Sequence, residues 1–379
     1  MTHTLSSTAQ RAYWLGRYLE RAESTARLVS VNARLFYDLP KRLPLGWQPL
    51  VVITGNQDVF NEFYDEPSEK NVTRFLINDA RNPSSLLNSI EFARENVRTL
   101  RGIIPRQAVE YVNELYLYAK DSLSEPLSRL RRSQSLIEIP KFTQRIEGFM
   151  SANMLHDDHW SFFRLGNYIE RADMTSRIID VGTDNMLADV VELEPFADIQ
   201  WRSVLLSLDA AQSYNTEVQE PINQAAVLEF LLQNPRLPRS LAYALKSTRN
   251  GLRALPRHDQ ALRRVNRLRR KVAAFNLTEA EQIREFLDEV QIALADLNSS
   301  ISRTYFATAS KRSPAKKIPE QKISKPADRT AADPTHSGQT ASSAKTAVKK
   351  RPSSRRSAAN RRTSKKTTTA TAEKGKSRS

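Results

Sequence analysis

The residues of this chain best suited to chemistry are glutamates and arginines that occur twice in the same arrangement. Residues 13–31 read YWLGRYLERAESTARLVSV and residues 163–181 read FRLGNYIERADMTSRIIDV, with nine of the 19 positions identical. At helical spacing, each segment gathers apolar side chains on one face and charged side chains on the other. The charged faces hold Glu20, Glu23 and Arg27 in the first segment, and Glu170, Asp173 and Arg177 in the second.

Four further residues of these segments support two hypotheses. Arg21 and Arg171 lie near the edge of the apolar face, and Gly16 and Gly166 lie one turn before each glutamate, where another backbone or a ligand can come close. In the first hypothesis the two charged faces meet as a crossed ion-pair network, because buried charges need partners. In the second they line a site whose guanidinium groups bind an anionic or zwitterionic ligand. We favour the network, because structural ion pairs commonly resemble sites.

A second charged cluster lies within residues 84–100. Arg94 and Arg98 alternate with Glu91 and Glu95 at spacings that suit ion pairs within one helix. The sequence therefore favours a salt-bridged helix face. The cluster joins the repeated glutamates and arginines if the helices pack side by side.

The other motifs give little support for catalysis. His156-Asp157-Asp158-His159 resembles a metal cluster, but aspartate at a helix start is favoured as a cap, with Asp158 as the candidate. The chain has no cysteine, which excludes a thiolate zinc site and a thiol nucleophile. It also has no glycine-rich phosphate loop and no serine-hydrolase or zinc-protease motif. The sequence favours a protein that is not an enzyme and that has neither metal nor cofactor.

The elements that must position these residues are predicted to be helices. Glycine is scarce, with ten in 379 residues, which favours helix over sheet. Long helices are predicted over residues 8–37, 84–100 and 158–186, and residues 283–301 place apolar side chains at spacings of three and four. The apolar run of residues 51–53 is too short and isolated for a sheet. The predicted fold class is all-α.

Further matches extend the repeat beyond one helix. The matched pairs are residues 47–52 with 201–206, 83–100 with 238–255, and 107–113 with 260–266. The sequence therefore predicts an internally duplicated multi-helix bundle, with copies at about 5–155 and 156–308 related by a pseudo-two-fold axis. Because long helices in both copies need a partner face, we expect one fused domain over residues 1–310.

Residues 311–379 differ from the rest in charge and composition. They hold 20 of the 58 basic and four of the 42 acidic residues, so residues 1–310 hold 38 of each. They also lack Phe, Trp and Tyr, which predicts a disordered tail. Clustered cations suit salt-dependent, sequence-independent binding of nucleic acid or another polyanion. The clusters contain Lys349, Lys350, Arg351, Arg355, Arg356, Arg361, Arg362, Lys365 and Lys366.

Other partners and a second basic segment remain open. The charge of the tail also suits an anionic membrane surface or an acidic protein. Cations on a predicted helix of the body can extend this basic surface, although a solvated helix face is the favoured interpretation. These cations are Arg263, Arg264, Arg267, Arg270 and Lys271.

The repeated segments resemble the bacterial alpha-E family. Residues 13–28 resemble its opening helix with the Glu-Arg motif, residues 162–177 its second motif and residues 93–98 its third. Asp157 falls where the family has an acidic residue ahead of the second helix. The resemblance covers about residues 4–306 and leaves the basic tail outside it.

This resemblance implies a protein that acts beside others. Alpha-E proteins are typically found with ATP-grasp ligase-like and transglutaminase-like proteins, in settings where a peptide or amide product is made or processed. On this resemblance the body is an accessory or scaffold subunit of such a ligase system. A ligand-binding or enzymatic domain that uses the glutamates and arginines, and a nucleic-acid-associated protein directed by its tail, are the alternatives. Without a signal peptide or an apolar run long enough to span a membrane, a cytoplasmic location is expected.

Overall fold

A computed structural model describes residues 6–38, 46–124, 128–187, 196–276 and 282–306. These residues form fourteen α-helices and one short π-helix, and none of them forms a strand, so the predicted all-α fold class is confirmed. The predicted disordered tail, residues 311–379, lies outside the described residues.

The first seven helices are α1 (Ser6–Asp38), α2 (Gln48–Thr54), α3 (Gln57–Phe63), α4 (Glu69–Ile77), α5 (Leu86–Thr99), α6 (Arg106–Leu123) and α7 (Arg129–Asn153). The next seven are α8 (Asp158–Leu187), α9 (Ala197–Ser207), α10 (Ala211–Glu217), α11 (Gln224–Gln233), α12 (Leu241–Arg253), α13 (Asp259–Ala274) and α14 (Ile283–Ile301). The π-helix η3 (Ser302–Phe306) follows α14 directly. The short apolar run at residues 51–53 lies in α2.

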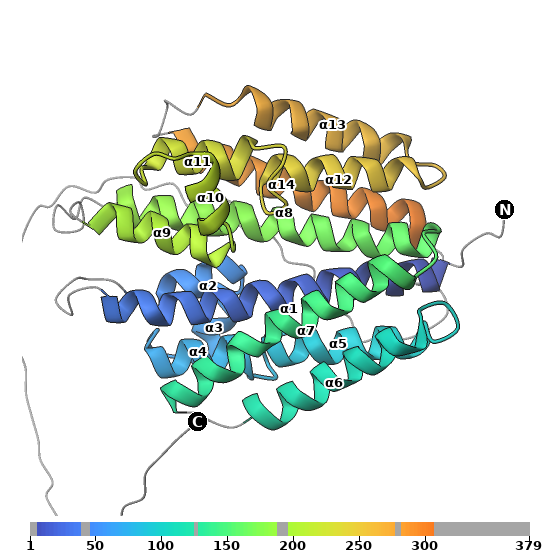
Figure 1. The fold of residues 1–379 in the computed structure, drawn as a ribbon, viewed down its shortest axis with the longest axis horizontal. Coiled ribbons are helices and arrows are strands. Elements are labelled where there is room, and N and C mark those ends of the chain that lie inside the picture. The colour runs from blue at the N-terminus through green and yellow to red at the C-terminus, as the bar shows by residue number, and fades with distance from the viewer. Residues whose placement is uncertain (1–5, 39–45, 125–127, 188–195, 277–281, 307–379) are drawn as a thin grey trace, which may run out of the picture. The chain divides into compact units, whose positions relative to one another are not determined.

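The longest helices, α1 and α8, lie side by side in the middle of the bundle (Figure 1). On one side α5 and α7 pack against α1, and on the other α12 and α14 pack against α8. Two short helices cross between these groups, since α2 contacts α8 and α9 contacts α1. The described residues of the body therefore share one continuous apolar core.

The contact between α1 and α8 depends on two glycines. A Cβ atom on Gly16 would lie 2.1 Å from the carbonyl oxygen of Phe163, and a Cβ atom on Gly166 would lie 1.9 Å from the carbonyl oxygen of Tyr13. No side chain fits at such distances, so glycine lets the two backbones touch. The close approach expected from the sequence is therefore made by a second backbone.

The predicted helix starts at residues 8, 84 and 158 lie within two residues of the observed starts of α1, α5 and α8. The Ser85 hydroxyl accepts a hydrogen bond from the backbone amide of Asn88 and caps α5. The prediction that Asp158 caps α8 is wrong, because the Asp157 carboxylate accepts the backbone amides of His159 at 2.9 Å and Trp160 at 3.2 Å. Asp158 is the first residue of α8, where its charge favours the positive end of the helix dipole.

The ends of α2 and α9 are alike. Gly55 directly follows α2 with φ +67°, and Asp209 lies two residues past the end of α9 with φ +53°. Both positions lie three residues past the matched segments 47–52 and 201–206, in the same register. The Gly55 amide donates to the carbonyl of Val52, and the Asp209 amide donates to the carbonyl of Leu206. Such matched contacts fit an internal duplication, which itself stays a prediction.

Candidate functional site

Glu170 of α8 is held by two arginines of α1. Its Oε2 atom lies 2.5 Å from Arg17 Nε, and its Oε1 atom lies 2.5 Å from Arg21 Nε. Arg21 Nη2 adds a second bond to Oε2 at 3.1 Å. Arg17 Nη1 also donates to the amide oxygen of Asn298 on α14 at 3.0 Å. The carboxylate is therefore saturated by side chains of the opposite helix.

Glu20 of α1 is held by the second half of the chain. Its Oε2 atom lies 2.6 Å from Arg171 Nη2 and 3.3 Å from the side-chain amide of Asn167, both on α8. Its Oε1 atom lies 2.6 Å from Nη1 of Arg239, which lies just before α12. Glu20 and Glu170 are each 1% exposed, so the two crossed ion pairs lie within the core.

Glu23 extends the network by one helical turn. Its Oε1 atom accepts hydrogen bonds from Arg27 Nη2 at 2.7 Å and from Arg239. Its Oε2 atom accepts the hydroxyl of Thr143 on α7 at 2.7 Å. Arg239 thus binds two carboxylates of α1, Glu20 and Glu23, and ties α12 to that helix.

At its edge the network reaches α7. Arg171 Nη2 lies 3.5 Å from Glu147 Oε2, and Arg164 forms an ion pair with the same carboxylate. The Glu147 side chain is 23% exposed, so the chain of charges runs from the core to the surface.

The arginines keep both buried glutamates ionised. Burial alone would raise the pKa of Glu20, but the charges of Arg171 and Arg239 overcome it and lower that pKa to about 2. Burial also opposes ionisation of Glu170, and the charges of Arg17 and Arg21 lower its pKa to about 2. Neither carboxyl group carries a proton near neutral pH, so neither is placed to act as a general acid.

The structure brings six of the ten proposed body residues together and leaves four apart. Asp173 pairs with Arg177 in its own helix at 3.1 Å. Arg94 Nε donates to Asn113 at 2.8 Å, and Arg98 pairs with its neighbour Glu95. Among the described contacts, none joins the charged side chains of residues 84–100 to the repeated glutamates and arginines. The six residues of the network are Glu20, Arg21, Glu23, Arg27, Glu170 and Arg171.

Sequence reasoning missed three important members of the network. Arg17 could have been found from the sequence, because the repeat matches it with another hydrogen-bond donor, Asn167. In the structure each of these two side chains donates to the glutamate of the opposite helix. Arg239 is matched with Ser84, so the repeat gave no sign of its role. Thr143 belongs to no repeated motif, and only the packing of α7 on α1 reveals it.

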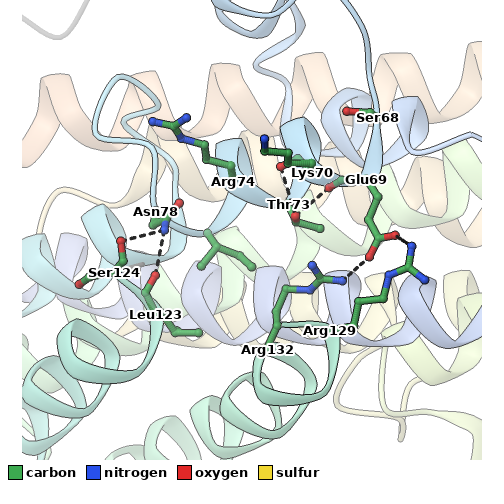
Figure 2. Close-up of a pocket in the computed structure, with 11 residues that line it drawn as sticks. Ser68, Glu69, Lys70, Thr73, Arg74, Asn78, Leu123, Ser124, Arg129 and Arg132 are labelled. Atoms are coloured by element: carbon green, nitrogen blue, oxygen red, sulfur yellow. Dashed lines mark hydrogen bonds and ion pairs between the residues drawn. The ribbon is translucent and has the colours of Figure 1, made fainter. Parts of the chain in front are cut away.

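A separate pocket lies between α4, the end of α6 and the start of α7 (Figure 2). It encloses about 590 Å³, within the size range of small-molecule sites. Arg129 and Arg132 converge on Glu69 at one side. Lys70 and Arg74 also line it and have no ion-pair partner within the described residues. The charge of the pocket suits a small anion, and no residue of the glutamate–arginine network lines it.

Two other kinds of site can be assessed for the described part of the chain. It contains no group of three or more His, Cys, Asp or Glu side chains that could hold a metal ion. The carboxylate of Asp157 instead caps α8. None of the described helices combines the length and the apolar character that a membrane crossing requires.

The fold and the network together define an all-helical protein built around two crossed glutamate–arginine contacts. The chain belongs to the Alpha-E family, described as a predicted alpha-helical domain with a conserved ER motif, and residues 4–306 match that family. The dipeptides Glu20-Arg21 and Glu170-Arg171, which supply the crossed contacts, both have the sequence ER.

The chain is also similar to three mycobacterial proteins, each of which is named as an uncharacterized protein. It is 25% identical over 310 residues to one protein of Mycobacterium bovis and to proteins of two strains of Mycobacterium tuberculosis. The match covers 76% of this chain and 34% of each relative, so the chain spans about a third of their length. No solved structure matches the chain.

Proposed function

We propose that this protein is a non-catalytic accessory or scaffold subunit of a peptide or amide ligase system of the ATP-grasp and transglutaminase-like type. The observation that carries the proposal is the saturation of the buried glutamates. Glu20 and Glu170 each bind two guanidinium groups and stay ionised, so they hold α1 against α8 instead of exchanging protons with a substrate.

The proposed partner class comes from the family resemblance. In the mycobacterial relatives the matched region makes up 34% of the chain, so the domain there is joined to a longer stretch of polypeptide. Domains that are joined in one chain often work together as separate chains elsewhere. We therefore expect this protein to act in the cytoplasm with a separate ligase-like partner.

Affinity capture of the full-length protein from a lysate of its own cells tests this proposal. We expect an ATP-grasp-like or transglutaminase-like protein to be recovered, and its ligase reaction to need this chain. Glu20→Gln is the matched variant, used at a temperature where circular dichroism shows it folded. It should support the reaction as well as the wild type, because the carboxylate is structural. Loss of the reaction with folded Glu20→Gln would favour the enzymatic alternative.

A ligand-binding role is the second candidate, and the pocket between α4, α6 and α7 supports it. Lys70 and Arg74 line the pocket of about 590 Å³ without a carboxylate partner among the described residues. Inorganic pyrophosphate is a suitable probe for calorimetry. Binding that disappears in Lys70→Gln/Arg74→Gln and persists in Glu20→Gln would place a ligand in this pocket and away from the network.

We also propose that residues 311–379 bind polyanions. The support is their charge, 20 basic against four acidic residues. Binding of a labelled DNA duplex by the full-length protein should weaken steeply as salt rises, because each neutralised phosphate releases counterions. Replacement of the nine clustered tail cations by Gln should weaken that binding. Absent or salt-insensitive binding would overturn the proposal.

A further inference from the structure

The hairpin formed by α12 and α13 carries an unusual charge. Residues 241–274 contain ten basic residues and one acidic residue. The matched hairpin of α5 and α6, residues 86–123, contains five of each. The electrical balance of residues 1–310 therefore conceals one strongly cationic region in the body.

This hairpin presents its charge outward. In Figure 1, α12 and α13 lie side by side, with α13 at the outer edge of the bundle. Arg264 and Lys271 pair with acidic residues of α14. The following five cations are exposed and form no ion pair within the described ranges: Lys246, Arg253, Arg263, Arg267 and Arg270.

Substitutions between the two hairpins explain the excess charge. On the first hairpin, glutamates occupy positions 91, 110 and 114. When the match of residues 107–113 with 260–266 is continued in the same register to residue 116, the corresponding positions of the second hairpin hold Lys246, Arg263 and Arg267. The acid that pairs with Arg145 in the first hairpin, for example, is replaced by a cation in the second. Cations have thus replaced acids along the length of the helix pair.

One contact between the two helices shows the same change in detail. In the first hairpin the Arg94 guanidinium lies 4.3 Å from the centre of the Tyr116 ring, a favourable cation–π contact, and Arg94 Nε donates to Asn113. The matched residues in the second hairpin are Arg249, Asn266 and Arg269. A second guanidinium therefore stands where the aromatic ring was.

Arg249 and Arg269 form no ion pair with a carboxylate among the residues that the structure describes. Arg249 Nε is buried and has no hydrogen-bond partner within the same described residues. Burial and then the charge of Arg249 lower the pKa of Arg269. A partly buried pair of like charges is unfavourable unless a bound anion separates them. An anion bound by both Arg249 and Arg269 would offset this repulsion.

We propose that the outer face of the α12–α13 hairpin binds the phosphate backbone of a nucleic acid duplex, with Arg249 and Arg269 sharing one phosphate. Rows of cations on neighbouring helices match a polymer of closely spaced phosphates. The only aromatic residue of this segment is Tyr243, which packs near Tyr168, so base stacking is not offered. No large apolar side chain of the hairpin is exposed for insertion into a membrane. This surface is separate from residues 311–379 and adds to the function proposed above.

Fluorescence anisotropy of a labelled DNA duplex with the full-length protein tests this surface. The variant Arg263→Gln/Arg267→Gln/Arg270→Gln should bind about tenfold more weakly or worse, and its salt slope should fall by about 1 for each phosphate that is no longer neutralised. The control Arg34→Gln/Arg101→Gln/Arg131→Gln removes the same charge from exposed positions without ion pairs among the described residues. The control should keep the wild-type slope.

Three outcomes would overturn the inference. The first is an equal loss of affinity in both triple variants, which would mean that net charge alone matters. The second is a loss of affinity confined to the tail variant, which would leave the tail proposal standing. The third is tighter binding to phosphatidylserine vesicles than to the duplex.

Arg269→Tyr gives an independent test, because it rebuilds the arrangement of the first hairpin. Removing the charge beside Arg249 should raise the thermal midpoint of unfolding and weaken duplex binding at the same time. These opposite changes separate a binding residue from a structural one. A lower midpoint with unchanged duplex binding would show that Arg269 serves the fold, and the shared phosphate would be ruled out.

Discussion

The two buried glutamates occupy matching positions on α1 and α8 but differ in how their arginines are shared. Glu170 is bound by Arg17 and Arg21, both from α1. Neither arginine forms an ion pair with a second carboxylate in the described part of the chain. This end of the network is therefore a closed unit, in which one carboxylate is the shared ion-pair partner of the buried Arg17 and the partly buried Arg21.

The other end is shared among more elements. Glu20 is bound by Arg171 and Arg239, and each of these arginines has another acceptor. Arg171 also reaches Glu147, and Arg239 also binds Glu23. The two matched glutamates therefore need not contribute equally to the stability of the fold. The loss of stability when one carboxylate is removed depends on which other acceptors its arginines keep.

The largest effect is expected for Glu170→Gln. This change leaves the buried Arg17 and the partly buried Arg21 without an ion-pair partner, and it should lower the free energy of unfolding by about 3–5 kcal/mol. Urea denaturation followed by circular dichroism measures the decrease. A smaller decrease for Glu170→Gln than for Glu20→Gln would contradict the proposed difference between the two glutamates.

Glu20→Gln should cost less, about 1–3 kcal/mol, because both of its arginines retain a carboxylate. The same denaturation measurement applies. The double variant Glu20→Gln/Glu147→Gln serves as a control, since it removes the second acceptor of Arg171 and should cost more than the sum of the single changes. Strict additivity would show that Glu147 does not compensate.

Acid should reveal the same carboxylates. The pKa values of Glu20 and Glu170 fall from 4.5 to about 2 in the folded protein, so their ionised forms stabilise the fold above pH 4.5. That contribution is lost as the pH falls from 4.5 towards 2. The free energy of unfolding of Glu170→Gln should therefore change less over this range than that of the wild type. The same pH dependence of the free energy of unfolding in Glu170→Gln and the wild type would contradict a stabilising role of the ionised Glu170.

The smallest effect is expected at the matched ends of α2 and α9. Asp209→Gly removes an ion pair with Arg27 at 3.1 Å, but the Asp209 side chain is 60% exposed and its φ of +53° suits glycine. The net change should stay within about 1 kcal/mol. The reverse change, Gly55→Asp, should be mildly destabilising, because a φ of +67° is unfavourable for a residue with a side chain, whereas the atom nearest the added Cβ, Arg177 Nη1 at 2.8 Å, is the flexible end of a side chain and can move. Equal effects of the two changes would argue against the matched geometry.

Local sequence signals predicted the helices well, but they did not predict which side chains contact one another in the network. The ranges expected for α1 and α8, residues 8–37 and 158–186, lie within one or two residues of the observed ends, because apolar periodicity and the absence of proline are local properties. The hydrogen bond of Arg239 with Glu20 spans 219 residues. Only the packing of α12 on α8 brings that guanidinium to α1, and no spacing rule reports such a contact.

The crossing of α1 and α8 also sets an order on the synthesis of the chain. α1 is synthesised before the helices that it contacts, since Arg171, the partner of Glu20, follows 151 residues later and Arg239 later still. Until these arginines have been made, burying the carboxylates of α1 would be unfavourable because they lack ion-pair partners. The first half of the chain therefore cannot form its complete core alone. Contacts between such distant segments form late and slow folding. The nascent protein therefore carries α1 without its buried ion-pair partners until α8 and the start of α12 have been made.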